Sequence, residues 1–292
     1  MGTTWSVRAV APLPGAVEGV QAALDRVVAQ MSQWEPDSDL SRFNRSPPGQ
    51  WRMLPPEFAR VLQAADDVAR ASGGAFDPAM GALSDIWGFG PAFAPAKAPD
   101  KAVIAAIMAN REAIEFDPPG LRARRAGQAR LDFSGIAKGF GVDQAAEWLL
   151  AQGMRHFLIE VGGELRGEGL KPDGQPWWVD IERPPGAVLP PTRVALHRLA
   201  VATSGNYRRW LDAGGKRYGH TLDPRSGQPV ENGVRSVTVL HTSCMLADAW
   251  ATALAVLGPV EGPALADRLG LAMHMLVGDT EHISAAFRGM LE

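Results

Sequence analysis

Strand-like segments that follow one another without an intervening helix constrain the fold of this chain most strongly. They are rich in valine, leucine, threonine and tryptophan, and they lie at residues 156–169, 176–184, 192–205, 219–224 and 234–243. Parallel strands need long crossover connections, usually through a helix, whereas directly joined strands pair antiparallel. The pattern therefore predicts an α+β fold with a mixed, mainly antiparallel sheet, rather than a doubly wound parallel one.

Three segments have the periodicity of amphipathic or buried helices. Residues 15–36 place apolar side chains on one helical face, and residues 55–74 form a second helix that Gly73 and Gly74 end. Residues 135–153 predict a third helix, which ends at a glycine as well. These helices have the length and the apolar faces needed to cover a sheet.

The remaining segments complete the predicted order of elements. We expect a strand at 1–10, a loop at 38–49, an ordered functional loop with a short helix at 75–100, a short strand at 129–135, and a helix followed by a strand at 262–278. No internal repeat or low-complexity linker divides the chain. The prediction is one domain over residues 1–292, with room for two closely packed subdomains.

Composition excludes several classes of function. The 292 residues carry a formal net charge of −3 at pH 7, which favours neither nucleic acid nor an anionic membrane as a partner. The single cysteine, Cys244, excludes an intramolecular disulfide and a multi-cysteine metal site, and its apolar neighbours indicate a core residue. We expect no transmembrane segment, because no run of about eighteen apolar residues occurs. The chain begins on a strand pattern, without a charged leader and an apolar core, so we expect no export signal within it.

An acidic residue and a hydroxyl share one face of an otherwise apolar helix at residues 246–258. Asp248 and Thr252 are four residues apart, which places their oxygens about one turn apart. Asp248 could cap orphan N–H groups of the first turn while Thr252 bonds a backbone carbonyl. Alternatively, the two oxygens hold a hard cation. The segment alone leaves both interpretations open.

Three glycine-rich segments allow backbone to approach a ligand closely. Residues 132–143 include Lys138, which fits either a phosphate contact or a surface position, and they match neither a Walker loop nor a dinucleotide fingerprint. Gly162 and Gly163 indicate either a bulge or a nearby ligand. Residues 204–206 fit a plain turn or donors to an anion.

Further side chains suit acid–base chemistry and ring stacking. His220 lies between a strand and a double turn, which fits either a fixed acid or base working near neutral pH or a structural histidine. Trp34 and Trp87 occupy loop-like segments, where an aromatic ring could stack on a planar ligand.

Taken in order, these segments resemble the FAD:protein FMN transferases, the ApbE-type flavin transferases. The motifs that carry the resemblance are MGTTWSV, SDLSRFN, GAFDPAMGALSDIWGFG, LDFSGIAKGFGVDQAAEWL, EVGGELRGEG, ATSGNYRRW, HTLDPRSGQPV and ADAWATALAVLG, from residue 1 to about residue 258. Each motif is weak alone, but all eight occur in the family's order. Ser134 departs from the glycine expected at its position, a small replacement that could shift a flavin contact.

The resemblance implies an α+β protein of a T-fold-related type that uses FAD as substrate together with Mg²⁺. Such enzymes cleave the pyrophosphate of FAD, transfer FMN to a threonine or serine hydroxyl of a target flavoprotein and release AMP, a bacterial post-translational flavinylation. The metal ligands it implies are Asp248, Thr252 and the backbone carbonyls of Ala137 and Ala251. It makes His220 the catalytic base and gives Lys138 the task of offsetting pyrophosphate charge. The residues it places around FAD are Met1, Trp34, Asn44, Trp87, Gly88, Phe89, Ser134, Phe140 and Leu222.

Two other functions remain open for this sequence. An FAD pyrophosphatase would use water in place of the hydroxyl and release FMN and AMP, whereas a non-catalytic flavin-binding protein would need neither cation nor base. The resemblance also implies a membrane redox subunit as the target and a location in the periplasm or at the periplasmic face of the inner membrane. The sequence alone also allows a cytoplasmic protein.

Overall fold

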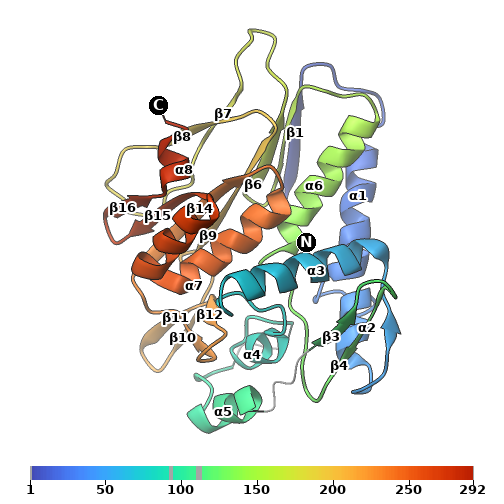
Figure 1. Ribbon diagram of the computed structural model, residues 1–292, viewed down its shortest axis with the longest axis vertical. Helices are drawn as coiled ribbons and strands as arrows, with labels where there is room; N and C mark the ends of the chain where they lie inside the picture. Colours follow the sequence, from blue (N-terminus) through green and yellow to red (C-terminus); the bar gives the residue numbers. More distant parts are fainter. Residues whose placement is uncertain (1, 92–94, 110–113, 292) are drawn as a thin grey trace. The chain divides into compact units, whose positions relative to one another are not determined.

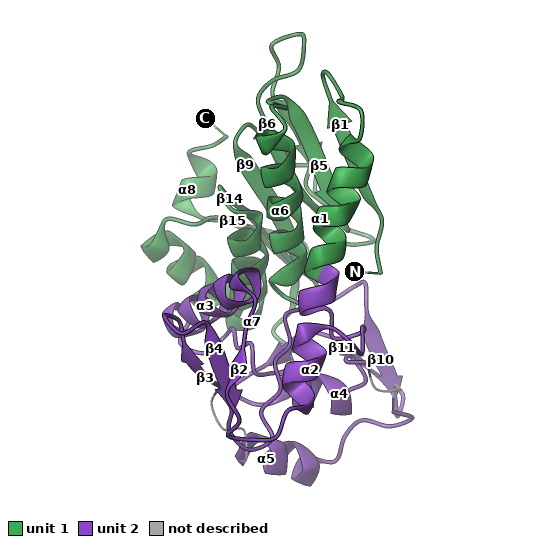
Figure 2. Ribbon diagram, turned by 90° about the vertical axis from the view of Figure 1, so that its right-hand side faces the viewer, with its two compact units in different colours: residues 1–27, 135–205, 232–292 green, residues 28–134, 206–231 purple. Residues whose placement is uncertain are grey.

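Two compact units, interleaved along the sequence, make up the chain. The computed structural model describes residues 2–91, 95–109 and 114–291. The first unit contains residues 1–27, 135–205 and 232–292, and the second contains residues 28–134 and 206–231 (Figure 2). Each unit has its own strands and its own core.

The first unit is built on a seven-stranded sheet. Its order is β1-β5-β6-β9-β14-β15-β16, and every neighbouring pair is antiparallel. The strands are β1 (Trp5–Ala9), β5 (Phe157–Val161), β6 (Glu164–Glu168), β9 (Leu199–Gly205), β14 (Val234–His241), β15 (Ala272–Val277) and β16 (Thr280–Ile283). The predicted α+β fold with a mainly antiparallel sheet is confirmed.

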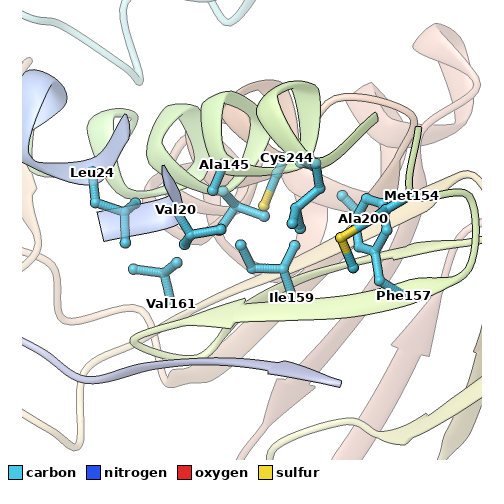
Figure 3. Close-up of a cluster of buried hydrophobic side chains, with 12 residues drawn as sticks. Val20, Leu24, Ala145, Met154, Phe157, Ile159, Val161, Ala200 and Cys244 are labelled. Atoms are coloured by element: carbon cyan, nitrogen blue, oxygen red, sulfur yellow. The ribbon is translucent and has the colours of Figure 1, made fainter. Parts of the chain in front are cut away.

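Side chains alternate across this sheet, as the twofold period of a strand requires. On β5, Phe157 and Ile159 face a cluster under the helices, whereas Leu158 belongs to a cluster on the other side. Figure 3 shows Phe157 and Ile159 beneath Ala145 and Cys244. Both faces of the central strands are therefore buried, which explains why β5 reads as a nearly continuous apolar run.

Helices cover one face of the sheet and a hairpin covers the other. The helices are α1 (Ala16–Met31), α6 (Ala137–Ala151) and α7 (Cys244–Leu269) (Figure 1). The helix α6 packs on β5 and β6, and α7 packs on β9 and β14. The hairpin of β7 (Trp177–Asp180) and β8 (Arg193–Leu196) packs on the opposite face together with α8 (Ala285–Arg288). The predicted helices at 15–36 and 135–153 are confirmed.

The helix α7 is long but interrupted. Gly258 has a φ of 81°, and Pro259 follows it, so two helical segments meet at a kink. Within the described residues, α7 is the one helix whose length and composition would allow a membrane span, and 67% of that window is buried inside the protein. A core helix passes the same test, so this is weak support for a membrane span.

The second unit combines short helices with three small sheets. The helices are α2 (Asp39–Arg45), α3 (Pro56–Ala71), α4 (Gly81–Ile86) and α5 (Lys101–Ala109). The sheets are β2 (Arg52–Met53), β4 (Arg122–Arg125) and β3 (Ile114–Asp117) in that order, β10 (Trp210–Ala213) with β11 (Lys216–Gly219), and β12 (Leu222–Asp223) with β13 (Gln228–Pro229). The predicted helix at 55–74 and short helix within 75–100 are confirmed.

Two local predictions are wrong. Residues 38–49, predicted as a loop, contain α2, because Ser38 caps the helix through the N–H of Ser41 at 3.0 Å and Leu40 and Phe43 bury its apolar side. Residues 129–135, predicted as a strand, form only one bridge, between Arg130 and Met80.

The pair Gly162 and Gly163 forms the turn of the β5–β6 hairpin rather than a bulge. Both residues have positive φ, 62° and 104°. Such angles are accessible to glycine and strained for other residues, which explains the pair at this position.

Candidate functional site

The first-unit part of the candidate site lies where α6 meets α7. A Cβ on Gly139 would lie 2.2 Å from the carbonyl oxygen of Cys244 and 2.9 Å from Cβ of Asp248. Only a residue without a side chain allows this separation of the two helices. Gly139, the first glycine of the AKGFG segment, therefore sets how closely the first turns of α6 and α7 approach each other.

Asp143 fixes the beginning of α7. Its carboxylate accepts hydrogen bonds from the N–H groups of Cys244 and Met245, each at 3.0 Å, and from the Ser243 hydroxyl at 2.7 Å. Arg166 donates to the same carboxylate at 2.9 Å. The N-terminus of α7 is thus capped from α6 and from its own N-cap residue, Ser243.

Asp248 does not cap its own helix. It lies in the second turn of α7, and its Oδ2 accepts the backbone N–H of Gly139, in the first turn of α6, at 3.0 Å. Ile136, at the N-cap position of α6, provides no side-chain cap, so the Asp248 side chain caps this helix instead. Among the described residues, no hydrogen bond reaches Oδ1 of Asp248.

Burial works against the charge of Asp248. The residue is only 3% exposed. Burial raises its pKa, and the Lys138 ammonium together with the Gly139 N–H oppose that rise. A divalent cation would stabilise the charged form in the same way, because it replaces lost hydration by coordination.

The hydroxyl of Thr252 is hydrogen-bonded to a residue of the sheet on which α7 packs. Its Oγ1 lies 2.9 Å from the Oγ of Ser204, at the end of β9. Ser204 belongs to the ATSG motif, for which the sequence left a plain turn or anion donors open. In the structure, its hydroxyl holds the Thr252 side chain, so Ser204 is a site residue that sequence reasoning did not assign.

Glu164 is a second acidic residue at this place, and sequence reasoning missed it. It is 2% exposed, and its Oε1 accepts the Lys138 ammonium at 2.5 Å. Its Oε2 is buried, and none of the residues that the structure describes gives it a hydrogen bond. Burial raises the pKa of Glu164 to about 7, although the Lys138 ammonium opposes the rise; the Asp248 charge adds to it. The available signal was an acidic residue directly after the Gly162–Gly163 turn.

The donors near α6 and α7 suit a hard cation. One carboxylate, one hydroxyl and backbone carbonyls are the oxygen ligands that Mg²⁺ accepts, with water and phosphate completing its octahedron. In the same unit, Oε2 of Glu164 is a buried acceptor with no hydrogen-bond partner among the described residues. Ala137 begins α6, and Ala251 lies one turn after Asp248 and beside Thr252. In the described part of the chain, no group of three or more His, Cys, Asp or Glu side chains is arranged so that it could hold a metal ion by itself.

Phe140 and Met1 are the other residues of this unit that were predicted to contact FAD. Phe140, on α6, is fully buried, so its ring belongs to the core. Met1 lies outside the described residues.

In the second unit, Arg209 contacts several of the residues that were predicted to bind FAD. Its guanidinium lies 5.3 Å from the Trp34 ring and 5.8 Å from the Phe89 ring, and it donates a long hydrogen bond of 3.4 Å to the Gly88 carbonyl. Burial lowers the pKa of Arg209, and Asp132 opposes this. Trp34 is 51% exposed, so its ring remains accessible for stacking. Sequence reasoning did not single out Arg209 within YRRW.

The imidazole of His220 is held by the same residue. Its Nδ1 lies 3.1 Å from the carbonyl oxygen of Arg209, and the rings of His220 and Phe89 meet edge to face at 6.3 Å. A carbonyl only accepts, so Nδ1 carries the proton in this bond, and Nε2 is the basic nitrogen of the neutral ring. The prediction of a fixed imidazole agrees with this geometry.

The other residues of the second unit that were predicted to contact FAD hold neighbouring segments in place through packing and hydrogen bonds. Trp87 is buried, packs on Tyr218 and donates its indole N–H to the Gly227 carbonyl at 3.0 Å, and Leu222 belongs to the same cluster. Asn44 bonds both the N–H and the carbonyl of Leu131, at 2.7 and 2.8 Å. The Ser134 hydroxyl accepts the Gln33 amide at 3.0 Å. Trp87 and Asn44 therefore shape the Gly88 turn and the segment before α6.

This combination of an α+β fold with an oxygen-rich helix junction and an arginine–aromatic–histidine cluster agrees with one known family. The model of the ApbE family matches residues 1–275, and the chain belongs to that family.

Named relatives match along almost the whole chain. Proteins named FAD:protein FMN transferase from Vibrio cholerae and Haemophilus influenzae are 35% and 34% identical, each covering 100% of this chain and 90% of the relative. The solved structure of the flavin transferase ApbE from Vibrio cholerae has a TM-score of 0.90 at 34% identity, covering 99% of this chain and 96% of that chain. The apo flavinyl transferase ApbE from Pseudomonas stutzeri has a TM-score of 0.88 at 37% identity, covering 99% and 94%.

Proposed function

We propose that this chain is an FAD:protein FMN transferase that cleaves FAD with the help of Mg²⁺, attaches FMN to a threonine or serine hydroxyl of a target flavoprotein and releases AMP. The named relatives, similar over the full chain, support the overall reaction. The observation that carries the chemical part is the hydrogen bond from the Gly139 N–H to Asp248, with Lys138 in the same first turn of α6 and Thr252 one turn after Asp248 on α7.

In this proposal, the ligands of the cation are Asp248, Thr252 and the backbone carbonyls of Ala137 and Ala251. When bound, Mg²⁺ would supply charge stabilisation for the pyrophosphate oxygens. Asp248 offers one charged oxygen while its other oxygen keeps the first turn of α6 in place. The Ser204 hydroxyl keeps Thr252 in one rotamer, which orients its oxygen.

Lys138 supplies a positive charge at the N-terminal end of α6. The end of a helix carries exposed N–H groups and a partial positive charge, both of which favour an anion. An ammonium beside that end adds to the same field. Charge that builds on phosphate oxygens during cleavage is thereby offset by groups already in position.

His220 takes the proton from the acceptor hydroxyl. The carbonyl of Arg209 fixes the Nδ1–H tautomer, so that Nε2 presents its lone pair without a change of tautomer. The exposed ring of Trp34, near the Arg209 guanidinium, provides a flat surface suited to a flavin or an adenine.

One experiment separates the proposed transfer from its alternatives. A purified acceptor flavoprotein is incubated with the enzyme, FAD and Mg²⁺, and its intact mass is measured while AMP is quantified. A mass increase of one FMN with an equal amount of AMP supports transfer. Release of AMP and free FMN without a mass increase would indicate a pyrophosphatase. Bound FAD that is never cleaved would indicate a flavin-binding protein.

A further inference from the structure

Glu164, the buried partner of Lys138, has no part in the proposed chemistry. Glu164 is 2% exposed, at the beginning of β6, directly after the hairpin turn, and it reaches the ammonium of Lys138 with Oε1. A buried acidic side chain costs free energy unless it is paired, so its presence needs a reason.

Lys138 pairs with Glu164, and its charge also acts on Asp248. It precedes Gly139, whose N–H is bonded to Asp248, so the lysine stem begins one residue from the Asp248 contact. Its charge opposes the upward pKa shifts of both Asp248 and Glu164. The side chain is partly exposed, and the stem of a lysine is flexible. In the structure, the ammonium rests on Glu164.

We propose that Glu164 is a positioning residue that holds the Lys138 ammonium away from Asp248 and thereby keeps the Asp248 carboxylate open to a divalent cation. The inference deepens the proposed function and rests on its cation site. An ammonium paired with Asp248 would compete with Mg²⁺ for the same oxygens, because both are cations that need the same lone pairs.

The proposal predicts a specific dependence between two substitutions. Glu164→Gln keeps the shape of the side chain but removes the charge that holds Lys138, so the lysine moves to Asp248 and Mg²⁺ binds more weakly, by about tenfold or more for one nearby charge. Lys138→Met alone removes the competitor and does not weaken Mg²⁺ binding. The double variant should bind Mg²⁺ within about threefold of Lys138→Met, a difference under 1 kcal/mol.

The measurement is a calorimetric Mg²⁺ titration of the full chain without FAD, with thermal unfolding of each variant alongside. Glu160→Gln is the matched control: it lies on the preceding strand, contacts the Gly163 N–H and should leave Mg²⁺ affinity unchanged. A double variant as weak as Glu164→Gln would overturn the proposal, because Glu164 would then act on the cation itself or on the fold. An unchanged affinity in Glu164→Gln would overturn it as well.

If Glu164→Gln does not fold, the comparison of the double variant with Lys138→Met still decides, because both lack the lysine. Equal affinities are expected, and a deficit confined to the double variant would contradict the proposal. Neither FAD nor an acceptor is present in these titrations. A failed transfer assay would therefore overturn the proposed function without altering this result.

Discussion

Asp248 on α7 accepts the backbone N–H of Gly139 on α6, with 3.0 Å between Oδ2 and the amide nitrogen. One side chain therefore caps a neighbouring helix and, in the proposed reaction, offers an oxygen to a cation. The two roles depend on different properties of the carboxylate. The first needs only an acceptor, whereas the second needs negative charge.

The substitution Asp248→Asn should separate these roles. An asparagine keeps an acceptor for the Gly139 N–H, and burial already disfavours the charge of Asp248, so we expect an unchanged or slightly raised melting temperature. AMP release at limiting Mg²⁺ should fall by about a hundredfold or more, the scale of losing one charge-stabilising group. Asp248→Ala should lose the activity and, in addition, about 1–3 kcal/mol of stability. Full activity of the asparagine variant at low Mg²⁺ would contradict the metal role.

Gly139→Ala should force α6 and α7 apart. The added methyl would lie 2.2 Å from the Cys244 carbonyl oxygen, which is backbone and cannot rotate away. We expect a loss of about 1–3 kcal/mol in the free energy of unfolding, typical of overpacking, together with weaker Mg²⁺ binding. Urea unfolding and a Mg²⁺ titration measure the two effects. Gly289→Ala is the control, since its added Cβ meets nothing closer than 3.7 Å.

Thr252→Val should weaken Mg²⁺ binding less than removal of Asp248 does. Valine keeps the branched shape but loses the hydroxyl, and it leaves the Ser204 hydroxyl without this partner. More Mg²⁺ should be needed for half-maximal AMP release, and Thr252→Ser should restore the parent's requirement. If the valine variant and the parent need the same Mg²⁺ concentration, Thr252 is only a helix residue.

His220→Ala should reduce the rate of FMN transfer by about 10²–10⁴-fold, the usual range for a positioned base, with little change in FAD affinity. The parent's rate should rise with pH as the ring loses its proton, because only the neutral imidazole accepts one, and the variant should lack this rise. Flavin fluorescence measures FAD binding, and protein mass measures transfer across the pH range. Lost FAD binding with an unchanged rate for the bound state would make His220 a binding residue instead.

Glu164 should make the stability of the free protein depend on pH. Burial raises its folded-state pKa from 4.5 to about 7. A raised pKa means that the folded state favours the protonated form, so this contribution is complete below about pH 4.5 and is lost as the pH rises through 7. Relative to Glu164→Gln, the parent should lose up to roughly 3 kcal/mol over that range. Urea unfolding at several pH values, in the presence of a chelator, tests this prediction. As the control, Glu160→Gln should keep the parent's dependence of the free energy of unfolding on pH. The same pH dependence in Glu164→Gln and the parent would refute the prediction.

Local periodicity and turn chemistry predicted much of the fold. The apolar face of α1, the glycines that end α3 and the nearly continuous apolar run of β5 depend on neighbours within a few residues, which the sequence displays directly. The helix α2 was missed, because its cap and its buried Leu40 and Phe43 lie among polar and proline residues that are typical of loops. The strand predicted at 129–135 does not form, because the backbone there bonds the Asn44 side chain and the segment 78–81 rather than a neighbouring strand.

For the site, the sequence by itself determined that Asp248 and Thr252 share one face of a helix, since four residues make about one turn. It also determined the order of motifs on which the family resemblance depends. Only the tertiary structure decided their partners: Gly139 for Asp248, Ser204 for Thr252, Glu164 for Lys138 and Arg209 for His220. The first three of these contacts join segments that are 26 to 109 residues apart in the sequence. The packing of helices on the sheet creates such contacts, and no local pattern encodes the distance between two side chains that meet only after the chain has folded.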